Sequence, residues 1–575
     1  MEMAKIRYLK IQNFRSIQRF EWWPNPGINC LIGPGDSGKS TVIDAIDLCL
    51  GPRRTKEFSD SDFFKLNTQD PIVIEITISE LEDTLKNFDK YDHFLRGVSP
   101  EDKIIEDEVG SGLESALTVV LRVDSDLDPQ WSLYSDRASA AGVEKSLAWG
   151  DRILLAGTRI DAANQFHLSW RKGSVLERLS DKKPDTAAKI ADAKRAAREA
   201  FSDIADDQLD ETLEQVEIIA ETLGVDLEVE LQALLNAQSI SLSGGTIAVH
   251  DADGIPLARL GLGSTRLLVA GLLNAAQNGS DLVLVDELEH GLEPHRIIRF
   301  LGALGAKDGN SPKQAFFTSH SPVVLRELNA DQLFVLRRSE DRHRALCASI
   351  DDHSQGSVRS QPEAFLAKRV LICEGASEVG MIRGIELYRS EQGEKSLFGA
   401  GLNLINAGGC SRLYERSPTL QSLGYACASF RDDDVEPDLV QETMFEANGG
   451  AVFKWQAGQK IEAAIVHGLP ASQLLQFIDC AVELHGEDLI DQHLNGASGG
   501  DLSVAFFRSA IDGSAITFDQ RDQLINACSG KKNPWFKNVG AMQELTKRVI
   551  APHFDECEVA FRSVINNIQI WALDG

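Results

Sequence analysis

The sequence lacks a paired-cysteine pattern and any long apolar run, and each absence excludes a class of protein. Its nine cysteines are scattered singly with no CxxC pair, which provides neither a zinc site nor a disulfide framework and suits a reducing cytosol. No apolar stretch approaches the ~20 residues of a membrane span, and the N-terminus has no signal-peptide core. We therefore expect a cytoplasmic protein with no membrane partner.

Basic residues are also in short supply, and the formal net charge is −29. This charge argues only weakly against a nucleic-acid partner, because enzymes of that kind gather their basic residues in one groove while acidic surface dominates the total. The hydrophobic fraction of 43% and the charged fraction of 25% are those of a globular protein. A chain of 575 residues is too long for one core, so we expect about three domains.

A phosphate-binding loop is predicted near the N-terminus. MAKIRYLKIQNFRSIQRFEW alternates apolar and polar residues as a half-buried strand pair does, and INCLIG reads as a buried strand. GPGDSGKST then fits G-x-x-x-x-G-K-[ST] before an apolar helix. Backbone N–H groups of such a loop surround phosphates, its lysine reaches the β- and γ-phosphates, and a hydroxyl holds Mg²⁺. The predicted ATP-binding residues here are Gly33, Gly35, Asp36, Ser37, Gly38, Lys39, Ser40 and Thr41, and the Mg²⁺ hydroxyl is either Ser40 or Thr41.

The partner motif of a phosphate loop lies far downstream, in DLVLVDELEHGLEP. A short apolar strand ends there in Asp286 and Glu287. An acidic residue at a strand tip reaches Mg²⁺ through water, and the next one orients the attacking water. We therefore expect Asp286 to help bind the metal and Glu287 to be catalytic. QAFFTSHSP predicts another strand, with His320 at its tip near the γ-phosphate.

Two segments compete for the role of an ABC-type signature loop. SLSGGT, residues 241–246, matches the signature literally, but its surroundings alternate with period two and have turns at 244–245 and 253–254. LGLGSTRLLVAGLLNAAQ has glycines before a helical run that leads into the acidic strand. We therefore assign the signature role, and a contact with ATP, to Gly261, Gly263 and Ser264.

NFRSI, GPGDSGKST, a degenerate signature, VDELEHGLEP and TSHSP follow in an order that resembles the RecF/SMC-like ABC ATPases. The resemblance implies that two heads sandwich ATP and that each signature loop contacts the nucleotide of the other head. It therefore implies a homodimer or a higher homo-oligomer. The expected ATPase head comprises residues 1–175 and 239–360. Between them, residues 176–238 are charged, with apolar residues at helical spacing, and are expected to form a helical dimerisation insert.

A second α/β unit, with a helical extension, is predicted over residues 361–575. RVLICEG reads as a buried strand ending in Glu374, and the helix after it carries Glu378 in its first turn. LNLINAGG and YACASFRDDD read as two further strands. Strands alternating with helices predict a parallel sheet whose functional residues gather at the carboxyl ends of the strands.

The acidic run after the third of these strands is either a solvated turn or a set of ligands for a divalent cation. Side chains two positions apart share a face, which pairs Asp432 with Asp434 and turns Asp433 away. Together with Glu374, these carboxylates repel one another unless Mg²⁺ lies among them, with Mn²⁺ or Ca²⁺ as alternatives. Which two of the three aspartates bind metal stays open.

This layout resembles the Toprim domain, and an ABC-type ATPase followed by Toprim resembles the OLD (overcoming lysogenization defect) nucleases over nearly the whole chain. The resemblance implies that Glu374 and Glu378 in EGASE carry ligands for two metals and that Lys537 in GKKNPWFKNV approaches the scissile phosphate. The acidic middle residue of the aspartate run departs from the family pattern. Asp501 and Glu462 are further candidate ligands, although for both the favoured interpretation is a surface carboxylate.

These patterns together predict a metal-dependent DNA endonuclease controlled by an ATPase, with ATP and Mg²⁺ as cofactors. The expected catalytic residues are Glu287, Glu374, Asp432, Asp434 and Lys537. The resemblance implies a role in bacterial anti-phage defence, acting alone, beside a UvrD-like helicase, or with a retron reverse transcriptase and its DNA. The alternative is a RecF-like ATP-gated DNA clamp. A role in strand passage is weaker, because the six tyrosines have no recognisable winged-helix module around them.

Overall fold

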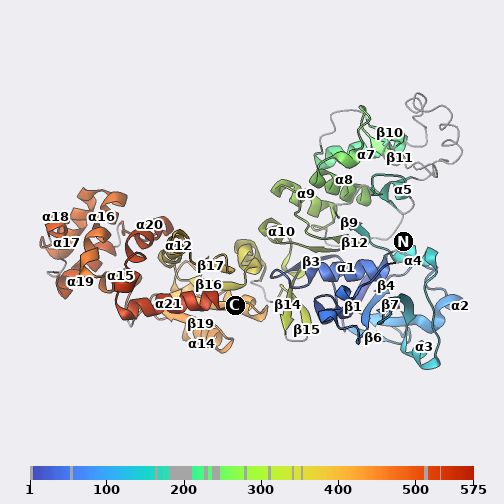
Figure 1. Ribbon diagram of the computed structural model, residues 1–575, viewed down its shortest axis with the longest axis horizontal. Coiled ribbons are helices and arrows are strands. Elements are labelled where there is room, and N and C mark those ends of the chain that lie inside the picture. The colour runs from blue at the N-terminus through green and yellow to red at the C-terminus, as the bar shows by residue number, and fades with distance from the viewer. Residues whose placement is uncertain are drawn as a thin grey trace. The chain divides into compact units, whose positions relative to one another are not determined.

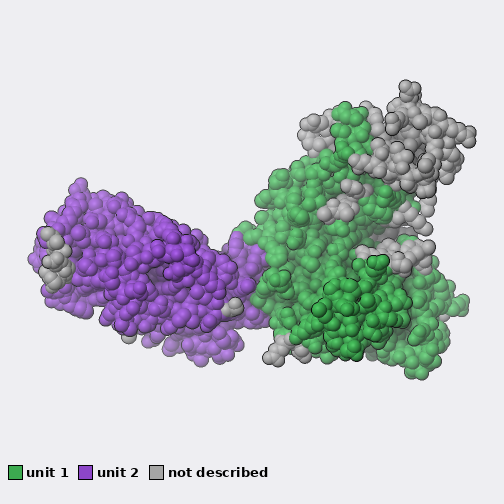
Figure 2. All heavy atoms as spheres, in the orientation of Figure 1, with its two compact units in different colours: residues 1–349 green, residues 350–575 purple. Residues whose placement is uncertain are grey.

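The chain divides into two compact units, residues 1–349 and residues 350–575 (Figure 2). The computed structural model describes residues 4–51, 56–161, 166–171, 174–180, 210–225, 231–235, 247–276, 282–308, 313–339, 342–350, 354–456, 458–509, 516–530 and 533–574. The expected boundary at 360–361 therefore lies inside the second unit. None of the described helices is long and apolar enough to cross a membrane.

The first unit is built on a 13-stranded mixed sheet (Figure 1). One part of it is parallel, with neighbours in the order β14, β3, β13, β12 and β9. These strands span Leu333–Ser339, Ile28–Ile32, Gln314–Thr318, Leu282–Val285 and Thr158–Ile160. Every residue of β3, β12 and β13 is buried, as in parallel strands with both faces covered.

The other part of this sheet is largely antiparallel. The predicted strand pair at the N-terminus is confirmed as β1 (Lys5–Phe14) and β2 (Ile17–Trp22), which run antiparallel. The remaining strands are β4 (Ile72–Ser79), β5 (Leu95–Ser99), β6 (Ile104–Glu106), β7 (Glu114–Val123), β8 (Pro129–Tyr134) and β15 (Arg342–Cys347). Apolar side chains of β1, β4 and β7 share one core with α1 (Lys39–Leu50).

The helix predicted after the signature glycines is present in the first unit, beside helices that were not predicted. The run after Gly261 is α8 (Leu262–Ala275), and α9 (Pro294–Ala303) follows the acidic strand. The others are α2 (Phe88–Tyr91), α3 (Asp136–Ala141), α4 (Trp149–Leu155), α5 (Val175–Leu179), α7 (Asp210–Leu223) and α10 (Pro322–Glu327).

Only parts of the expected insert are described. α7 lies within it, and residues 181–209 fall outside the described residues. β10 (Gln232–Leu235) adds a strand where helix was expected, and it pairs with β11 (Ile247–His250). The literal signature match at 241–246 also lies outside the described residues.

The second unit contains a four-stranded parallel sheet in the order β17, β16, β18, β19. The three predicted strands are β16 (Arg369–Cys373), β17 (Leu402–Asn406) and β18 (Ala426–Arg431). β19 (Ala451–Lys454) was not predicted. The helices around the sheet are α11 (Ser354–Ser360), α12 (Ala376–Glu391), α13 (Ser417–Ser422) and α14 (Leu439–Ala447).

Helices fill the rest of the second unit, and α16 to α19 gather at one end of it (Figure 1). They are α15 (Ile461–Gly468), α16 (Leu474–His485), α17 (Glu487–Ser498), α18 (Val504–Ser509), α19 (Phe518–Cys528), α20 (Val539–Leu545) and α21 (Val559–Leu573).

One face of α12 is made of glycine where α20 packs against it. A Cβ on Gly380 would lie 2.6 Å from the carbonyl oxygen of Val539, and a Cβ on Gly384 would lie 2.7 Å from the carbonyl oxygen of Gln543. These separations are far below van der Waals contact, so the two helices approach as closely as they do only because both positions lack a side chain.

Candidate nucleotide site and candidate metal site

The predicted phosphate loop joins β3 to α1. Gly33 (φ +141°) lies so close to β14 that a Cβ would sit 2.7 Å from the Leu336 carbonyl oxygen, and Gly38 (φ +91°) precedes the first residue of α1. Gly35 and Asp36 form the exposed tip of the loop, while Ser37 is buried. The loop therefore has the backbone that an anion-binding turn before a helix requires.

Lys39 is 6% exposed, and its ammonium donates hydrogen bonds to the carbonyl oxygens of Gly33 (3.1 Å) and Pro34 (2.8 Å). Burial lowers the pKa of this ammonium, against the opposing influence of Asp286. A phosphate group placed in the loop would offer the same donor a charged acceptor.

The geometry distinguishes the two candidate Mg²⁺ hydroxyls. Ser40 Oγ donates to Asp286 Oδ1 (3.1 Å), and Thr318 Oγ1 donates to the same oxygen (2.6 Å). The Thr41 hydroxyl is instead paired with Ser16 Oγ (3.2 Å). Ser40 and Asp286 therefore lie where a hydroxyl and a carboxylate could share a magnesium ion.

Glu287 follows Asp286 in the left-handed region, with φ +48°, and its side chain is 61% exposed. Its N–H donates to Thr318 Oγ1 (2.8 Å). A non-glycine residue held at positive φ is uncommon, so the surrounding contacts fix this turn. The carboxylate is thereby presented at the tip of β12.

Arg266 of α8 supplies much of that fixation, and sequence reasoning missed it. Its guanidinium is 2% exposed and donates to the carbonyl oxygens of Asp286, Glu287 and His290, each at 2.9 Å. The available signal was a single arginine within the otherwise apolar run RLLVAGLL. An isolated buried cation needs acceptors, and main-chain carbonyls are one source of them.

The assigned signature residues lie against the same acidic loop of their own chain. Gly261 precedes α8, and a Cβ on Gly263 would lie 2.0 Å from the Gly291 carbonyl oxygen. Ser264 Oγ accepts from Arg296 (2.8 Å).

The strand tip carrying His320 is held by a carboxylate. Glu289 accepts from Ser319 Oγ (2.8 Å) and from the His320 N–H (2.6 Å). Burial lowers the pKa of the His320 imidazole, and Lys39 lowers it further. Both effects favour the neutral form of the His320 ring.

The second group of site residues lies at the carboxyl edge of the four-stranded sheet. Cys373 of β16 is in register with Phe430 of β18, so the residues that follow these strands are neighbours. The Asp432 N–H donates to Glu374 Oε2 (3.1 Å), and Asp432 Oδ1 accepts from the Ile461 N–H (2.8 Å). The structure therefore brings Glu374 and Asp432 together.

Two more carboxylates lie beside them. Glu378 is 3% exposed, and its Oε2 accepts from the Gly375 N–H (2.8 Å). Glu462, in the first turn of α15, is 2% exposed, and neither of its carboxylate oxygens has a hydrogen-bond partner among the described residues. The expectation that Glu462 is a surface carboxylate is therefore wrong, because α15 packs into the core and carries this residue inward with it.

Burial and mutual repulsion raise the pKa values of this acidic group. The pKa of Glu378 is raised to about 7, chiefly by burial and then by Glu374 and Glu462. The pKa of Asp432 is raised to about 8, again by burial first and then by Glu378, Glu374 and Glu462. Burial also raises the pKa of Glu374, to which Asp434 adds.

Among the described residues, Lys537 forms an ion pair with the buried Glu462, with Nζ 4.0 Å from Oε1. Its ammonium lies at the end of a half-exposed side chain, whereas Trp535 and Phe536 before it are buried. Ser377 Oγ donates to the Phe536 carbonyl oxygen (3.3 Å), which ties this segment to the first turn of α12.

The other acidic candidates have different surroundings. Asp433 pairs with Arg431 and Lys454, each at 3.1 Å, and Asp434 pairs with Lys460 (3.3 Å). Asp501 is exposed after α17, and no contact in the described part of the chain joins it to the group.

Among the described residues, no three His, Cys, Asp or Glu side chains are spaced to hold a metal ion as they stand. Glu374, Glu378 and Asp432 each direct one carboxylate oxygen to a backbone N–H. Small side-chain rotations would be needed to present their second oxygens together with Glu462. Carboxylate oxygens are the ligands that Mg²⁺ and Mn²⁺ prefer, so the donor set fits such an ion.

Comparison with known proteins concerns the first unit. Residues 8–110 match the family model "AAA domain", and residues 119–326 match "AAA domain, putative AbiEii toxin, Type IV TA system". No curated protein matches the chain.

Three SMC head structures are similar to part of it. The first is an SMC head bound to the C-winged helix domain of ScpA, with 14% identity and a TM-score of 0.34, covering 60% of this chain and 97% of that one. The second is an SMC head with an extended coiled coil bound to the C-terminal domain of ScpA from Pyrococcus furiosus, with 13% identity and a TM-score of 0.34, covering 60% of this chain and 96% of that one. The third is the SMC head domain from Thermotoga maritima, with 12% identity and a TM-score of 0.29, covering 60% of this chain and 98% of that one. The two family matches include the phosphate loop and the strand ending in Asp286. The first unit is therefore an ATPase domain of the AAA family.

Proposed function

We propose that this chain is an ATP-regulated, divalent-metal-dependent DNA endonuclease whose nuclease site is the acidic group of the second unit. The observation that carries the proposal is the buried Glu462 carboxylate, which lacks a hydrogen-bond partner beside three further carboxylates. A buried carboxylate without hydrogen bonds is strongly unfavourable, and the half-exposed Lys537, with Nζ 4.0 Å from Glu462 Oε1, offsets that cost only in part. A bound divalent cation would offset that unfavourable energy by pairing with the carboxylates.

The proposed ligands are Glu374, Glu378, Asp432 and Asp434, with Glu462 added to the set. Divalent cations bound there would supply Lewis-acid activation of water and stabilisation of the leaving 3′-oxygen. Lys537, half-exposed and paired with Glu462, would offset charge on the phosphate in the transition state. Raised pKa values at Glu378 and Asp432 also allow protons to leave as cations bind.

ATP binding at the phosphate loop would control this reaction, with Glu287 orienting the attacking water and each signature loop serving a second copy of the chain. The resemblance to OLD nucleases supports DNA as the substrate and anti-phage defence as the setting. It also supports a UvrD-like helicase, or a retron reverse transcriptase with its DNA, as the partner.

The proposal is tested by nicking of supercoiled plasmid in Mg²⁺ or Mn²⁺, with and without ATP. We expect Asp432→Asn and Glu462→Gln to abolish nicking. Asp433→Asn is the matched control, because Asp433 faces Arg431 and Lys454, and it should retain activity. Equal loss in all three variants, or nicking that persists in EDTA, would exclude the proposed site.

One observation favours the competing function, a DNA clamp gated by ATP in which the second unit is structural. Within the described ranges, no three metal-binding side chains are already spaced as ligands. A clamp would retain plasmid through a salt wash only when ATP is present, and it would leave the plasmid uncut in both Mg²⁺ and Mn²⁺. Loss of retention in Lys39→Ala would show that the retention depends on the phosphate loop.

A further inference from the structure

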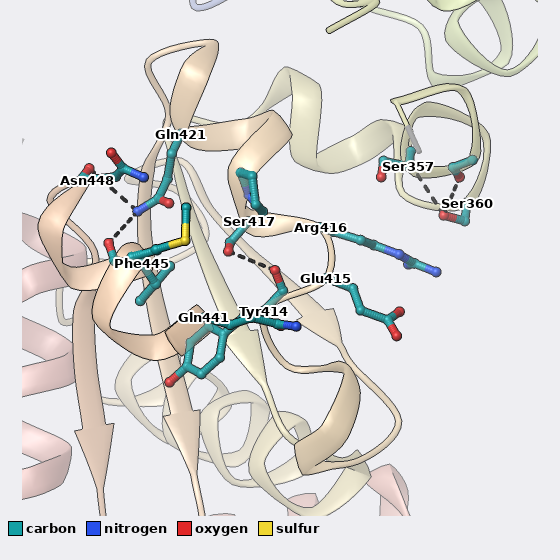
Figure 3. Close-up of a pocket in the computed structure, with 13 residues that line it drawn as sticks. Ser357, Ser360, Tyr414, Glu415, Arg416, Ser417, Gln421, Gln441, Phe445 and Asn448 are labelled. Atoms are coloured by element: carbon teal, nitrogen blue, oxygen red, sulfur yellow. Dashed lines mark hydrogen bonds between the residues drawn. The ribbon is translucent and has the colours of Figure 1, made fainter. Parts of the chain in front are cut away.

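A pocket of about 680 Å³ lies in the second unit, away from the acidic group. It is enclosed by α11, by the turn before α13, and by α13 and α14 (Figure 3). Its volume is within the range of small-molecule sites. The residues that carry the argument are Tyr414, Arg416, Gln421, Gln441, Met444 and Asn448.

The two sides of this pocket differ in chemistry. Figure 3 shows Gln421, Phe445 and Asn448 on one side, and Arg416 reaching towards Ser360 on the other. The Phe445 ring lies 5.0 Å from the Tyr414 ring, and Met444 is 59% exposed. One side therefore offers amide groups beside the exposed Met444, with the buried Phe445 and Tyr414 rings behind them, and the other offers a guanidinium beside serine hydroxyls.

Arg416 is available for an anion. Its side chain has no ion pair or hydrogen bond within the described part of the chain, and it is partly buried. Gln421 Nε2 donates to the Phe445 carbonyl oxygen (2.8 Å), which fixes the amide and leaves its oxygen as an acceptor on the pocket side. A flat ring with polar edges at one end and a phosphate at the other would match both sides.

A chain of hydrogen bonds joins the pocket wall to the acidic group. The buried Tyr414 hydroxyl donates to Glu442 Oε1 (2.8 Å), and Arg431 Nε donates to the same oxygen (3.1 Å). The Arg431 guanidinium then donates to the carbonyl oxygen of Asp432 (2.8 Å) and to Asp433 Oδ1 (3.1 Å). Arg431 is 3% exposed and the Glu442 side chain is 14% exposed, so a largely buried chain of hydrogen bonds leads from Tyr414 to the backbone of Asp432.

We propose that this pocket binds a nucleotide, with its base against Met444 and the amide side chains and its phosphate on Arg416, and that occupancy shifts the position of Asp432 through Tyr414, Glu442 and Arg431. The nucleotide is either a free nucleoside monophosphate or the terminal nucleotide of a DNA strand, since both present the same chemistry. The binding stands on the pocket alone, whereas the regulatory effect rests on the proposed metal site.

Binding is tested by calorimetry on the full chain carrying Lys39→Ala, which removes the phosphate-loop lysine as a competing site. The probes are the four deoxynucleoside 5′-monophosphates, with the nucleosides and inorganic phosphate alone as comparisons. We expect saturable binding that weakens about tenfold or more in Arg416→Glu, the effect of losing one charge-assisted pair. Arg412→Glu, an exposed arginine outside the pocket, should bind as the parent does.

A 5′-phosphorylated oligonucleotide tests the second source. If the oligonucleotide binds more tightly than the monophosphates and needs its 5′-phosphate, the ligand is a strand end. If only the monophosphates bind, the ligand is a free nucleotide. Absence of saturable binding for every probe, or equal binding in the two arginine variants, would overturn the proposal.

The coupling is tested by Mn²⁺ affinity, measured from the electron paramagnetic resonance of free Mn²⁺. Nucleotide should change this affinity in the Lys39→Ala parent. Tyr414→Phe keeps the ring but removes the hydroxyl, so it should bind nucleotide and lose the change. An unaltered change in Tyr414→Phe would remove the hydrogen-bonded chain from the proposal. If Mn²⁺ does not bind at all, the proposed nuclease site fails, and calorimetry alone decides the nucleotide site.

Discussion

Replacing Glu462 by glutamine should make the metal-free protein more stable while abolishing its response to metal. The Glu462 carboxylate is 2% exposed, has no hydrogen-bond partner among the described residues, and lies near Glu378 and Asp432. Within the described part of the chain its ion-pair partner is Lys537, whose Nζ lies 4.0 Å away at the end of a half-exposed side chain. An amide of the same shape removes the repulsion and the cost of burying a charge.

The size of the effect follows from the burial. An unsatisfied buried polar group costs about 1–3 kcal/mol, and more when charged, so Glu462→Gln should stabilise the second unit in EDTA by about that amount. For a unit of this length, each kcal/mol raises the melting temperature by roughly 2–4 °C. Metal at a hundred times its Kd would stabilise the wild-type unit by about 2.7 kcal/mol. Glu462→Gln should lose most of that increment. In Mn²⁺, the wild-type second unit should therefore become as stable as the variant or more stable.

Differential scanning calorimetry of the full chain at pH 8 measures both effects, since ATP should move the transition of the first unit and Mn²⁺ that of the second. Glu386→Gln is the matched control. Glu386 is equally buried but accepts from Ser396 Oγ and from the Leu397 N–H (2.7 Å), so its replacement should destabilise. If Glu462→Gln lowers the melting temperature in EDTA as Glu386→Gln does, the Glu462 carboxylate is satisfied in the fold and the reasoning for a metal site fails.

Two further predictions concern catalysis and pH. Arg266→Met should lower ATP turnover at saturation by about tenfold and leave ATP affinity nearly unchanged, because three carbonyls around Glu287 lose a donor while the phosphate loop is untouched. Steady-state kinetics measures the turnover, and binding of a fluorescent nucleotide measures the affinity. Weakened affinity with normal turnover would contradict the role given to Arg266. In EDTA, the stability of the second unit should fall as pH rises from about 4 to about 8, because raised pKa values at Glu378 and Asp432 mean that the folded state holds more protons than the unfolded chain over that range. Mn²⁺ should flatten this profile by replacing the protons, and a calorimetric series showing the same slope in both conditions would refute the assignment.

Local spacing was enough to predict the parts of the molecule whose chemistry is written in consecutive residues. The phosphate loop, the strand ending in Asp286 and the strands ending near Glu374 and Asp432 all follow from short motifs bounded by glycines or acidic residues. The parallel pairing of β16 and β18 then placed Glu374 beside Asp432 without further information.

What escaped prediction depends on packing between distant segments. Glu462 reads as one more polar residue in QKIEAAIVHG, and only the docking of α15 turns it inward. Arg266 has no recognisable role until the carbonyls of the acidic loop lie above α8. β19 is only four residues long, which is too short to give a clear strand pattern. The choice between Ser40 and Thr41 as the Mg²⁺ ligand rests on the position of Asp286.

The glycine face of α12 links helix packing to the surroundings of the acidic group. Gly380 and Gly384 let α20 come close, and α20 begins just after Lys537, while Glu378 lies on α12 itself. The close packing of the helix that follows Lys537 therefore depends on two positions without a side chain. Adding a methyl group at Gly384 would push the helices apart and should therefore shift Lys537 relative to the carboxylates.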